Sequence, residues 1–261
     1  MTKRKSIRTD ISWSTTDKIT VKGLDLCEDI LGKVSLGDMA FLELTDRLPT
    51  PQESTVFNAI AVSLVEHGMT PSAIVTRMTI AGAPEAMQAA VGAGLCGLGS
   101  VFVGSMEDAA RLLQDALPLT RPEAKIAVDI AALARQIVDT QMALGKSVPG
   151  IGHHIHKPID PRTPKLFEIA QANGFSGQYV ALMSAVAAEA GRRLGKNLPV
   201  NATGAIAAVA SELGLPWHIV RGVGVMARAI GLVAHVLEEL RNPMAREIKA
   251  MVEEQATAHL R

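Results

Sequence analysis

Apolar residues recur along most of the chain every three or four positions, the spacing of one face of an α-helix. Helix-start signals divide this pattern: Thr50 and Glu53 have the spacing of a capping box around Pro51, and Thr70 and Thr163 also precede a proline. Glycines mark several helix ends. The pattern predicts eleven helices, at about 35–46, 51–67, 71–80, 84–98, 106–117, 122–144, 164–173, 177–194, 204–213, 217–240 and 244–258.

Strand patterning is confined to the start of the chain. Ile11 and Trp13, then Ile19 and Val21, alternate with polar residues on either side of the segment 14–18. This alternation predicts a short hairpin. We therefore expect an all-α protein with a short N-terminal β-hairpin.

Composition narrows the class of protein. Apolar residues make up 48% of the chain, enough for a sizeable core, and 26 basic residues balance 26 acidic ones. This balance gives no electrostatic reason to expect a nucleic-acid or membrane partner. We expect no run that approaches the roughly 18–20 apolar residues of a membrane span, and the basic N-terminus lacks a signal-peptide core. Cys27 and Cys96 lie in apolar stretches without metal-ligand spacing, which predicts buried free thiols in a cytoplasmic protein.

The segment from Ser147 to Thr163 is the longest break in the helical pattern, and it contains three histidines, a lysine and an arginine. Its glycines allow close backbone approach, and Arg162 suits bidentate binding of a carboxylate. Together these features indicate a site that polarises one oxygen and holds a carboxylate beside it. The histidines at 153, 154 and 156 leave a metal site or a solvated basic loop as alternatives. No further cysteine or histidine accompanies them at a usual spacing, so we expect no metal.

Four other positions carry candidate chemistry. His67 falls on the inward face at a helix end, where it is either favoured by the helix dipole or directed into a cleft. Arg228 lies in an apolar helix, where it either pairs with a buried acid or binds an anionic ligand. Asn201 and Thr203 precede an alanine-rich helix, where Thr203 is a good N-cap and the helix start suits an anion or enolate.

These motifs occur in the order found in the citrate synthase superfamily, which the chain resembles over nearly its whole length. It is most similar to the short citryl-CoA lyase-like members and to the C-terminal module of ATP-citrate lyase. The residues that carry the resemblance are Gly150, Gly152, His153, Asp160, Pro161 and Arg162 in the loop, His67 and Gly68, Asn201, and the helical segment 227–235 around Arg228.

The resemblance implies a citrate synthase-like helical fold. A large domain made of residues 1–104 and 216–261 would be closed by a small domain of residues 105–215. It implies a homodimer or higher homo-oligomer whose ligands are an acyl-CoA and a di- or tricarboxylate. Coenzyme A would be part of a thioester substrate, with no tightly bound cofactor.

The resemblance also implies roles for single residues. His67 and His153 would contact the reacting oxygen, and Thr203 occupies the position of the family's catalytic base. The carboxylates would be bound by Arg162, Arg228 and Asn201, with Arg246 or Arg241 reaching across from a partner subunit. The coenzyme A moiety would lie against Val148, Gly150, Ile151, Gly152 and Lys196.

The chain departs from the family at Thr203, because the family has an aspartate there and a hydroxyl is too weak a base to replace it. A family histidine is also absent from 101–105, as in the short lyase-like members, and His154 replaces an arginine. The favoured function is cleavage of citryl-CoA to acetyl-CoA and oxaloacetate, or the reverse, with Glu66 or Asp108 as substitute carboxylates. The alternatives are an enzyme for another acyl-CoA or oxo-acid, and a non-catalytic binding relative.

Overall fold

The computed structural model describes residues 7–101, 103–119, 128–152 and 158–261. All eleven predicted helices are present in these ranges. They are α1 (Leu36–Thr45), α2 (Pro51–Val65), α3 (Pro71–Gly82), α4 (Met87–Cys96), α5 (Gly104–Ala116), α6 (Ile130–Ala143), α7 (Arg162–Ala172), α8 (Gln178–Leu194), α9 (Ala202–Glu212), α10 (Trp217–Arg241) and α11 (Ala245–Thr257). The expected all-α fold is confirmed.

Contacts divide the chain into two compact units, Met1–Asn58 and Ala59–Arg261. In the first unit, β1 (Ser12–Ser14) pairs antiparallel with β2 (Ile19–Val21), which confirms the predicted hairpin. A short third strand, β3 (Leu24–Asp25), pairs with β2 and was not predicted. A π-helical turn, η1 (Leu26–Ile30), follows it and helps to bury a small core with β2 and α1.

The start of α2 shows why the capping signal is reliable. The Thr50 N–H donates to the Glu53 carboxylate (2.8 Å), and the Glu53 N–H donates to the Thr50 hydroxyl (3.2 Å). The reciprocal bonds satisfy donors that a helix start leaves open. Arg47 adds an ion pair with Glu53, and its hydrogen bonds are the main reason that the pKa of Glu53 falls to about 2.

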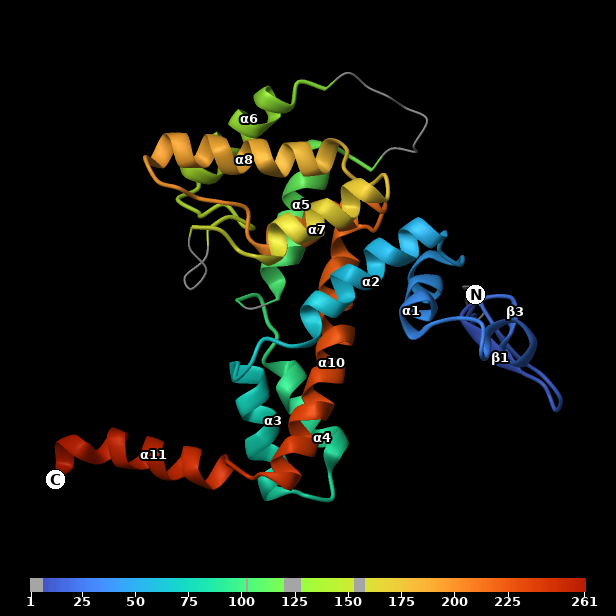
Figure 1. Cartoon of the computed structure of the whole chain (residues 1–261), viewed down its shortest axis with the longest axis vertical. Helices are drawn as coiled ribbons and strands as arrows, with labels where there is room; N and C mark the ends of the chain where they lie inside the picture. Colours follow the sequence, from blue (N-terminus) through green and yellow to red (C-terminus); the bar gives the residue numbers. More distant parts are fainter. Residues whose placement is uncertain (1–6, 102, 120–127, 153–157) are drawn as a thin grey trace, which may run out of the picture. The chain divides into compact units, whose positions relative to one another are not determined.

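The second unit is organised around α10, which packs against α3, α4, α5 and α9 (Figure 1). Helix α6 packs against α8, and α7 and α8 both pack against α9. The expectation that no segment approaches a membrane span is wrong for α10. It contains an 18-residue window with a mean hydropathy of 1.5. Half of that window is buried by the packed helices, as in the core helix of a folded domain.

Three local predictions need correction. The helix expected at 122–144 begins instead at Ile130, where the Asp129 carboxylate caps it by accepting the Ala132 N–H. Thr163 does not cap α7. It lies inside the first turn, and its hydroxyl donates to the Val200 carbonyl (3.0 Å).

The cysteines were also misplaced, because both are exposed. Cys96 is the last residue of α4, and Cys27 lies in η1, whose buried residue is Ile30. Apolar neighbours in the sequence do not bury a residue that faces outward. The predicted division at residues 104 and 216 stays a prediction.

Candidate active site

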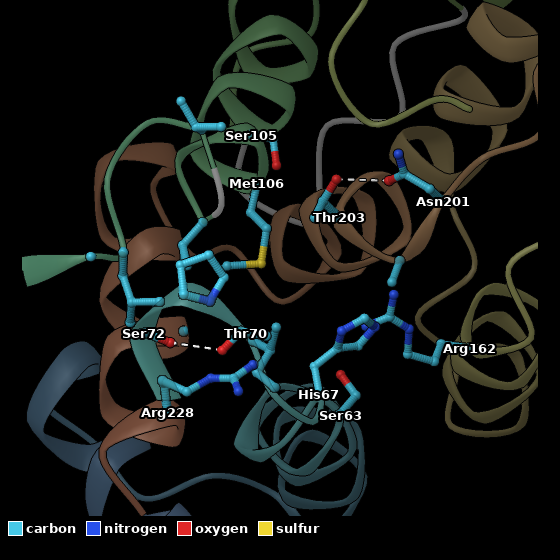
Figure 2. Close-up of a pocket in the computed structure, with 18 of the residues that line it drawn as sticks. Ser63, His67, Thr70, Ser72, Ser105, Met106, Arg162, Asn201, Thr203 and Arg228 are labelled. Carbon is cyan, nitrogen blue, oxygen red and sulfur yellow. Dashed lines mark hydrogen bonds between the residues drawn. The ribbon is translucent and has the colours of Figure 1, made fainter. Parts of the chain in front are cut away.

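A cavity of about 620 Å³ lies within the second unit. Its walls come from the end of α2, the corner between α2 and α3, the segment between α4 and α5, and the first residues of α7 and α9. Side chains of α10 complete it. Six of the predicted site residues line it: His67, Gly152, Arg162, Asn201, Thr203 and Arg228. Figure 2 shows the side chains of His67, Arg162 and Arg228 reaching it from different elements.

The corner that carries His67 is held by the residue before it. The Glu66 carboxylate accepts the backbone N–H groups of His67 (2.8 Å) and Gly68 (2.7 Å). The hydroxyl of Thr70 then caps α3 by accepting the Ala73 N–H. These bonds define the direction in which the chain leaves α2, and so they place His67 on the cavity wall.

Arg228 is a largely buried cation on the cavity wall. Its side chain is 11% exposed, and its Nη1 has no hydrogen-bond partner among the described residues. The nearest carboxylate oxygen is that of Glu66, 3.7 Å away, too far for a hydrogen bond. Burial and the positive charge of Arg162 lower the pKa of Arg228, while Glu66 opposes the shift. Arg228 thus forms a loose ion pair with the partly exposed Glu66, and its binding of an anionic ligand stays a prediction.

Arg162 is anchored by an acid that the sequence interpretation gave no role. Its Nε and Nη2 donate to the two oxygens of Asp160 at 3.1 and 2.9 Å. Asp160 is fully buried and also accepts the N–H of Ala202, the first residue of α9 (3.0 Å). This carboxylate thus joins the start of α7 to the start of α9 and orients the guanidinium.

Burial alone would raise the pKa of Asp160, but the hydrogen bonds from Arg162 and Ala202 outweigh it and lower the pKa to about 2. Asp160 is therefore a poor proton acceptor at neutral pH, although it lies close to the cavity. The sequence signal was available in the Asp-Pro-Arg motif, where an acid two residues before an arginine can pair with it.

This low pKa predicts a pH-dependent contribution to stability. A carboxyl group with a folded pKa near 2 and an unfolded value near 3.8 stabilises the fold above about pH 4, and the contribution is lost as the pH falls towards 2. We expect the difference in unfolding free energy between the wild type and Asp160→Asn to shrink by about 1 kcal/mol between pH 5 and pH 3. Urea unfolding at each pH measures it, and a pH-independent difference would contradict the assignment.

Asn201, and not Thr203, caps α9. Asn201 is the N-cap of α9, since its Oδ1 accepts the Gly204 N–H (3.1 Å). The Thr203 hydroxyl donates to the same oxygen (2.7 Å), so the prediction of Thr203 as the N-cap is wrong. The Asn201 amide donates to the Gly152 carbonyl (2.6 Å). Asn201 therefore orients the loop and Thr203, and Thr203 presents its remaining lone pairs to the cavity.

The loop glycines serve the fold as well as the cavity. A Cβ on Gly150 would lie 2.7 Å from the Cα of Gly204, so the loop backbone contacts the start of α9 where neither residue has room for a side chain. Backbone bonds from Gly152 to Pro199 and from Asn201 to Gly150 hold this contact. Close approach was expected towards a ligand, but Gly150 makes it with α9, and only Gly152 reaches the cavity wall.

The other predicted residues lie outside the lining of this cavity. Arg246 is exposed on α11, and the exposed Lys196 lines a separate cavity of about 340 Å³ at the end of α8. Val148, Gly150 and Ile151 precede the lining residue Gly152 without joining it. His153, His154 and His156 lie outside the described residues, so their roles stay predictions. No group of three potential metal ligands occurs in the described ranges.

Neither proposed substitute for the missing aspartate lines the cavity. Oε1 of Glu66 accepts two N–H groups at the corner, and Asp108 pairs with Arg111 (2.9 Å) on α5. Asp108 instead lines a larger cavity of about 740 Å³ between α5, α6 and the residues before the loop. Ser105 lines both cavities and so marks where they adjoin. Among the described lining residues of the first cavity there is no carboxylate.

Comparisons with known proteins point to one family. The family model for the C-terminal domain of citrate synthase matches residues 14–249. The solved structure of citryl-CoA lyase from Hydrogenobacter thermophilus has 35% identity and a TM-score of 0.80, covering 91% of this chain and 88% of that one.

Longer relatives share the fold over part of their length. ATP citrate lyase from Methanothrix soehngenii, solved with citrate and coenzyme A, has 23% identity and a TM-score of 0.73, over 92% of this chain and 40% of that one. A probable ATP-citrate synthase of Dictyostelium discoideum is 26% identical over 256 residues, 92% of this chain and 39% of that protein. The chain thus spans about two fifths of this curated relative. The motif-based resemblance is confirmed, and the chain belongs to the citrate synthase family.

Proposed function

We propose that the protein cleaves citryl-CoA to acetyl-CoA and oxaloacetate, or catalyses the reverse reaction. The observation that carries this proposal is the pair of arginines at one cavity, with the buried Nη1 of Arg228 lacking a hydrogen-bond partner. Two neighbouring guanidinium groups favour an anionic ligand, and planar forks suit carboxylates. The 35% identity to a citryl-CoA lyase supports the choice of substrate.

His67 is the group best suited to move the proton. Cleavage removes the proton of the tertiary hydroxyl and breaks the adjacent carbon–carbon bond, which leaves the keto group of oxaloacetate and the enolate of acetyl-CoA. The proton then returns to the enolate carbon. Among the described lining residues, His67 is the imidazole, the kind of side chain that can both accept and return a proton at neutral pH. Arg162 and Arg228 would hold the carboxylates throughout.

The cavity between α5 and α6 would receive the coenzyme A moiety. Its walls carry Arg111 and Lys146, which suit phosphate groups, together with the acids Asp108 and Asp115, and Arg111 is paired with Asp108. Ser147 and Pro149, which flank the predicted contact Val148, also line it. Since Ser105 joins the two cavities, a thioester arm entering here would reach His67. The predicted contacts from Val148 to Gly152 belong to this proposal, with Lys196 nearer the α8 end.

The test is citryl-CoA cleavage by the purified protein, followed as NADH oxidation when malate dehydrogenase reduces the released oxaloacetate. We expect turnover in the wild type and a loss of about 10²–10⁴-fold in His67→Ala. His218→Ala, an exposed histidine on α10, is the matched control and should retain activity. Equal activity in His67→Ala and the wild type would reject His67 as the proton acceptor.

A second candidate function rests on a specific observation. Among the described lining residues no carboxylate is present, and the Thr203 hydroxyl donates to Asn201. A site of this kind suits a different acyl-CoA or oxo-acid, or binding without turnover. Coenzyme A binding by calorimetry without citryl-CoA cleavage would favour this candidate. Turnover of another acyl-CoA would then indicate an enzyme rather than a protein that binds without turnover.

We also propose that the active protein is a homodimer formed through α10. Its exposed apolar residues alternate at spacings of four and three, the pattern of a helix–helix seam, at Met226, Ile230, Val233, Leu237 and Leu240. A second copy offers the same stripe, as a two-fold interface requires. Arg246 of the partner subunit would then be free to approach the neighbouring cavity, as the resemblance implies.

Light scattering tests the dimer. We expect Ile230→Glu combined with Val233→Glu to halve the molecular mass, because two buried carboxylates in each copy would face each other without partners. Lys165→Glu, a charge change on the exposed side of α7, should leave the mass unchanged. A double variant of wild-type mass would contradict the α10 interface.

A further inference from the structure

A buried polar cluster lies behind the cavity wall, on the far side of Glu66. Arg77 on α3 is fully buried, and its Nε donates to Nδ1 of His235 on α10 (3.1 Å). Its other nitrogens contact Glu238 and, at 3.2 Å, Glu239. The cluster is distinct from the cavity lining and has no part in the proton transfers proposed above.

The hydrogen bond from Arg77 determines which ring nitrogen of His235 carries the proton. An arginine cannot give up its proton, so Nδ1 of His235 must be the acceptor and the ring proton must lie on Nε2. Nε2 lies 3.1 Å from Oε2 of Glu66. Arg77 thereby places the ring proton of His235 on the nitrogen nearest the Glu66 carboxylate, within contact distance but without the geometry of a hydrogen bond.

Glu66 lies between two residues of the same face of α10. Arg228, Gly231 and His235 are spaced by three and four residues, so they form one stripe. A Cβ on Gly231 would lie 2.1 Å from the carbonyl oxygen of Val65 and 2.9 Å from Oε2 of Glu66. The glycine allows the corner to lie directly on the helix, with the Glu66 carboxylate between Arg228 and His235.

Glu66 is held closer to the other groups than to Arg228. Its donors are the backbone N–H groups of His67 and Gly68 at 2.8 and 2.7 Å, and Nε2 of His235 lies at 3.1 Å, whereas Arg228 is 3.7 Å away. Without these contacts, the partly exposed Glu66 carboxylate beside the largely buried Arg228 guanidinium would form a close, bidentate pair. Such a pair would occupy the donors that Arg228 turns towards the cavity.

We propose that His235 is a positioning residue that retains Glu66 and so keeps Arg228 available for a substrate carboxylate. This inference deepens the proposed function and rests on it for the identity of the carboxylate. Arg77 acts through His235, because it determines which ring nitrogen carries the proton. The expected consequence is specific: losing His235 weakens carboxylate binding through Glu66, and removing the charge of Glu66 reverses the loss.

The experiment uses the full chain and measures binding of oxaloacetate and of coenzyme A by calorimetry, with the KM for oxaloacetate and kcat in the synthesis direction. His235→Leu should bind oxaloacetate at least about tenfold more weakly, with coenzyme A affinity unchanged. His235→Gln should remain near the wild type, because its amide can accept from Arg77 and donate to Glu66. His235→Leu with Glu66→Gln should recover oxaloacetate affinity, since the amide oxygen still accepts the corner N–H groups without attracting Arg228.

A merely structural role for His235 predicts no recovery in the double variant, and that result would overturn the proposal. If His235→Leu does not fold, Glu66→Gln alone decides: equal or tighter oxaloacetate binding is expected, and weaker binding would overturn the proposal. Wild-type protein that binds neither oxaloacetate nor citrate would reject the proposed function instead. A crystal structure of His235→Leu then tests the cluster alone, since the proposal requires Glu66 and Arg228 within 3 Å, and the wild-type separation would overturn it.

Discussion

Replacing Thr203 with aspartate is expected to raise the rate of citryl-CoA cleavage. Thr203 lies on the cavity wall in the first turn of α9, where the helix dipole favours a negative charge. The described lining residues include no carboxylate, so the new group would supply a proton donor and acceptor facing the acetyl-CoA enolate. A general acid–base contributes about 10²–10⁴-fold, which sets the scale of the expected gain in kcat.

Thr203→Asn separates basicity from shape in this experiment. Asparagine has nearly the size of aspartate and can also bond near the start of α9, but it does not titrate. We expect the gain only with aspartate, accompanied by an acidic limb in the pH–rate profile. No gain with either variant would mean that the enolate is protonated elsewhere or that the natural thioester is not citryl-CoA.

Removing the charge of Arg228 is expected to have the second large effect. Arg228→Met keeps the length of a buried side chain and removes the donors that face the cavity. Truncating one partner of a buried charge pair costs about 2–5 kcal/mol, a factor of roughly 30 to 4,000 in affinity. We therefore expect carboxylate binding to weaken by that factor, with coenzyme A binding nearly unchanged. Calorimetry with oxaloacetate and with coenzyme A measures both.

Substituting Arg228 disturbs the neighbouring structure less than substituting Arg162 would. Loss of Arg162 would leave the fully buried Asp160 without its main partner and would weaken the junction of α7 with α9. Glu66 loses little in Arg228→Met, because the corner N–H groups remain. Arg221→Met, on the same helix but outside the cavity lining, is the matched control. Equal loss of oxaloacetate and coenzyme A binding in Arg228→Met would contradict its assignment to the carboxylate.

Much of the fold was predictable because local signals and helical periodicity agreed. Each predicted helix exists, and the capping residues Thr50 and Thr70 act as expected. The errors occur where a side chain that suits a capping role forms a different hydrogen bond. Thr163 bonds to Val200, 37 residues away, and Thr203 donates to Asn201, which caps α9 instead. Capping preferences describe the turn alone and contain no information about such partners.

The sequence by itself determined the helical class, the order of the motifs and the residue types of the site, since these depend on spacing and on side-chain chemistry. Only the tertiary structure decided which charges remain available. Asp160 is used by Arg162 and α9, Glu66 is retained at the corner and beside His235, and Arg228 keeps an open donor. Contacts between residues up to 169 positions apart make that selection (Glu66 to His235), and it follows from packing rather than from any local pattern.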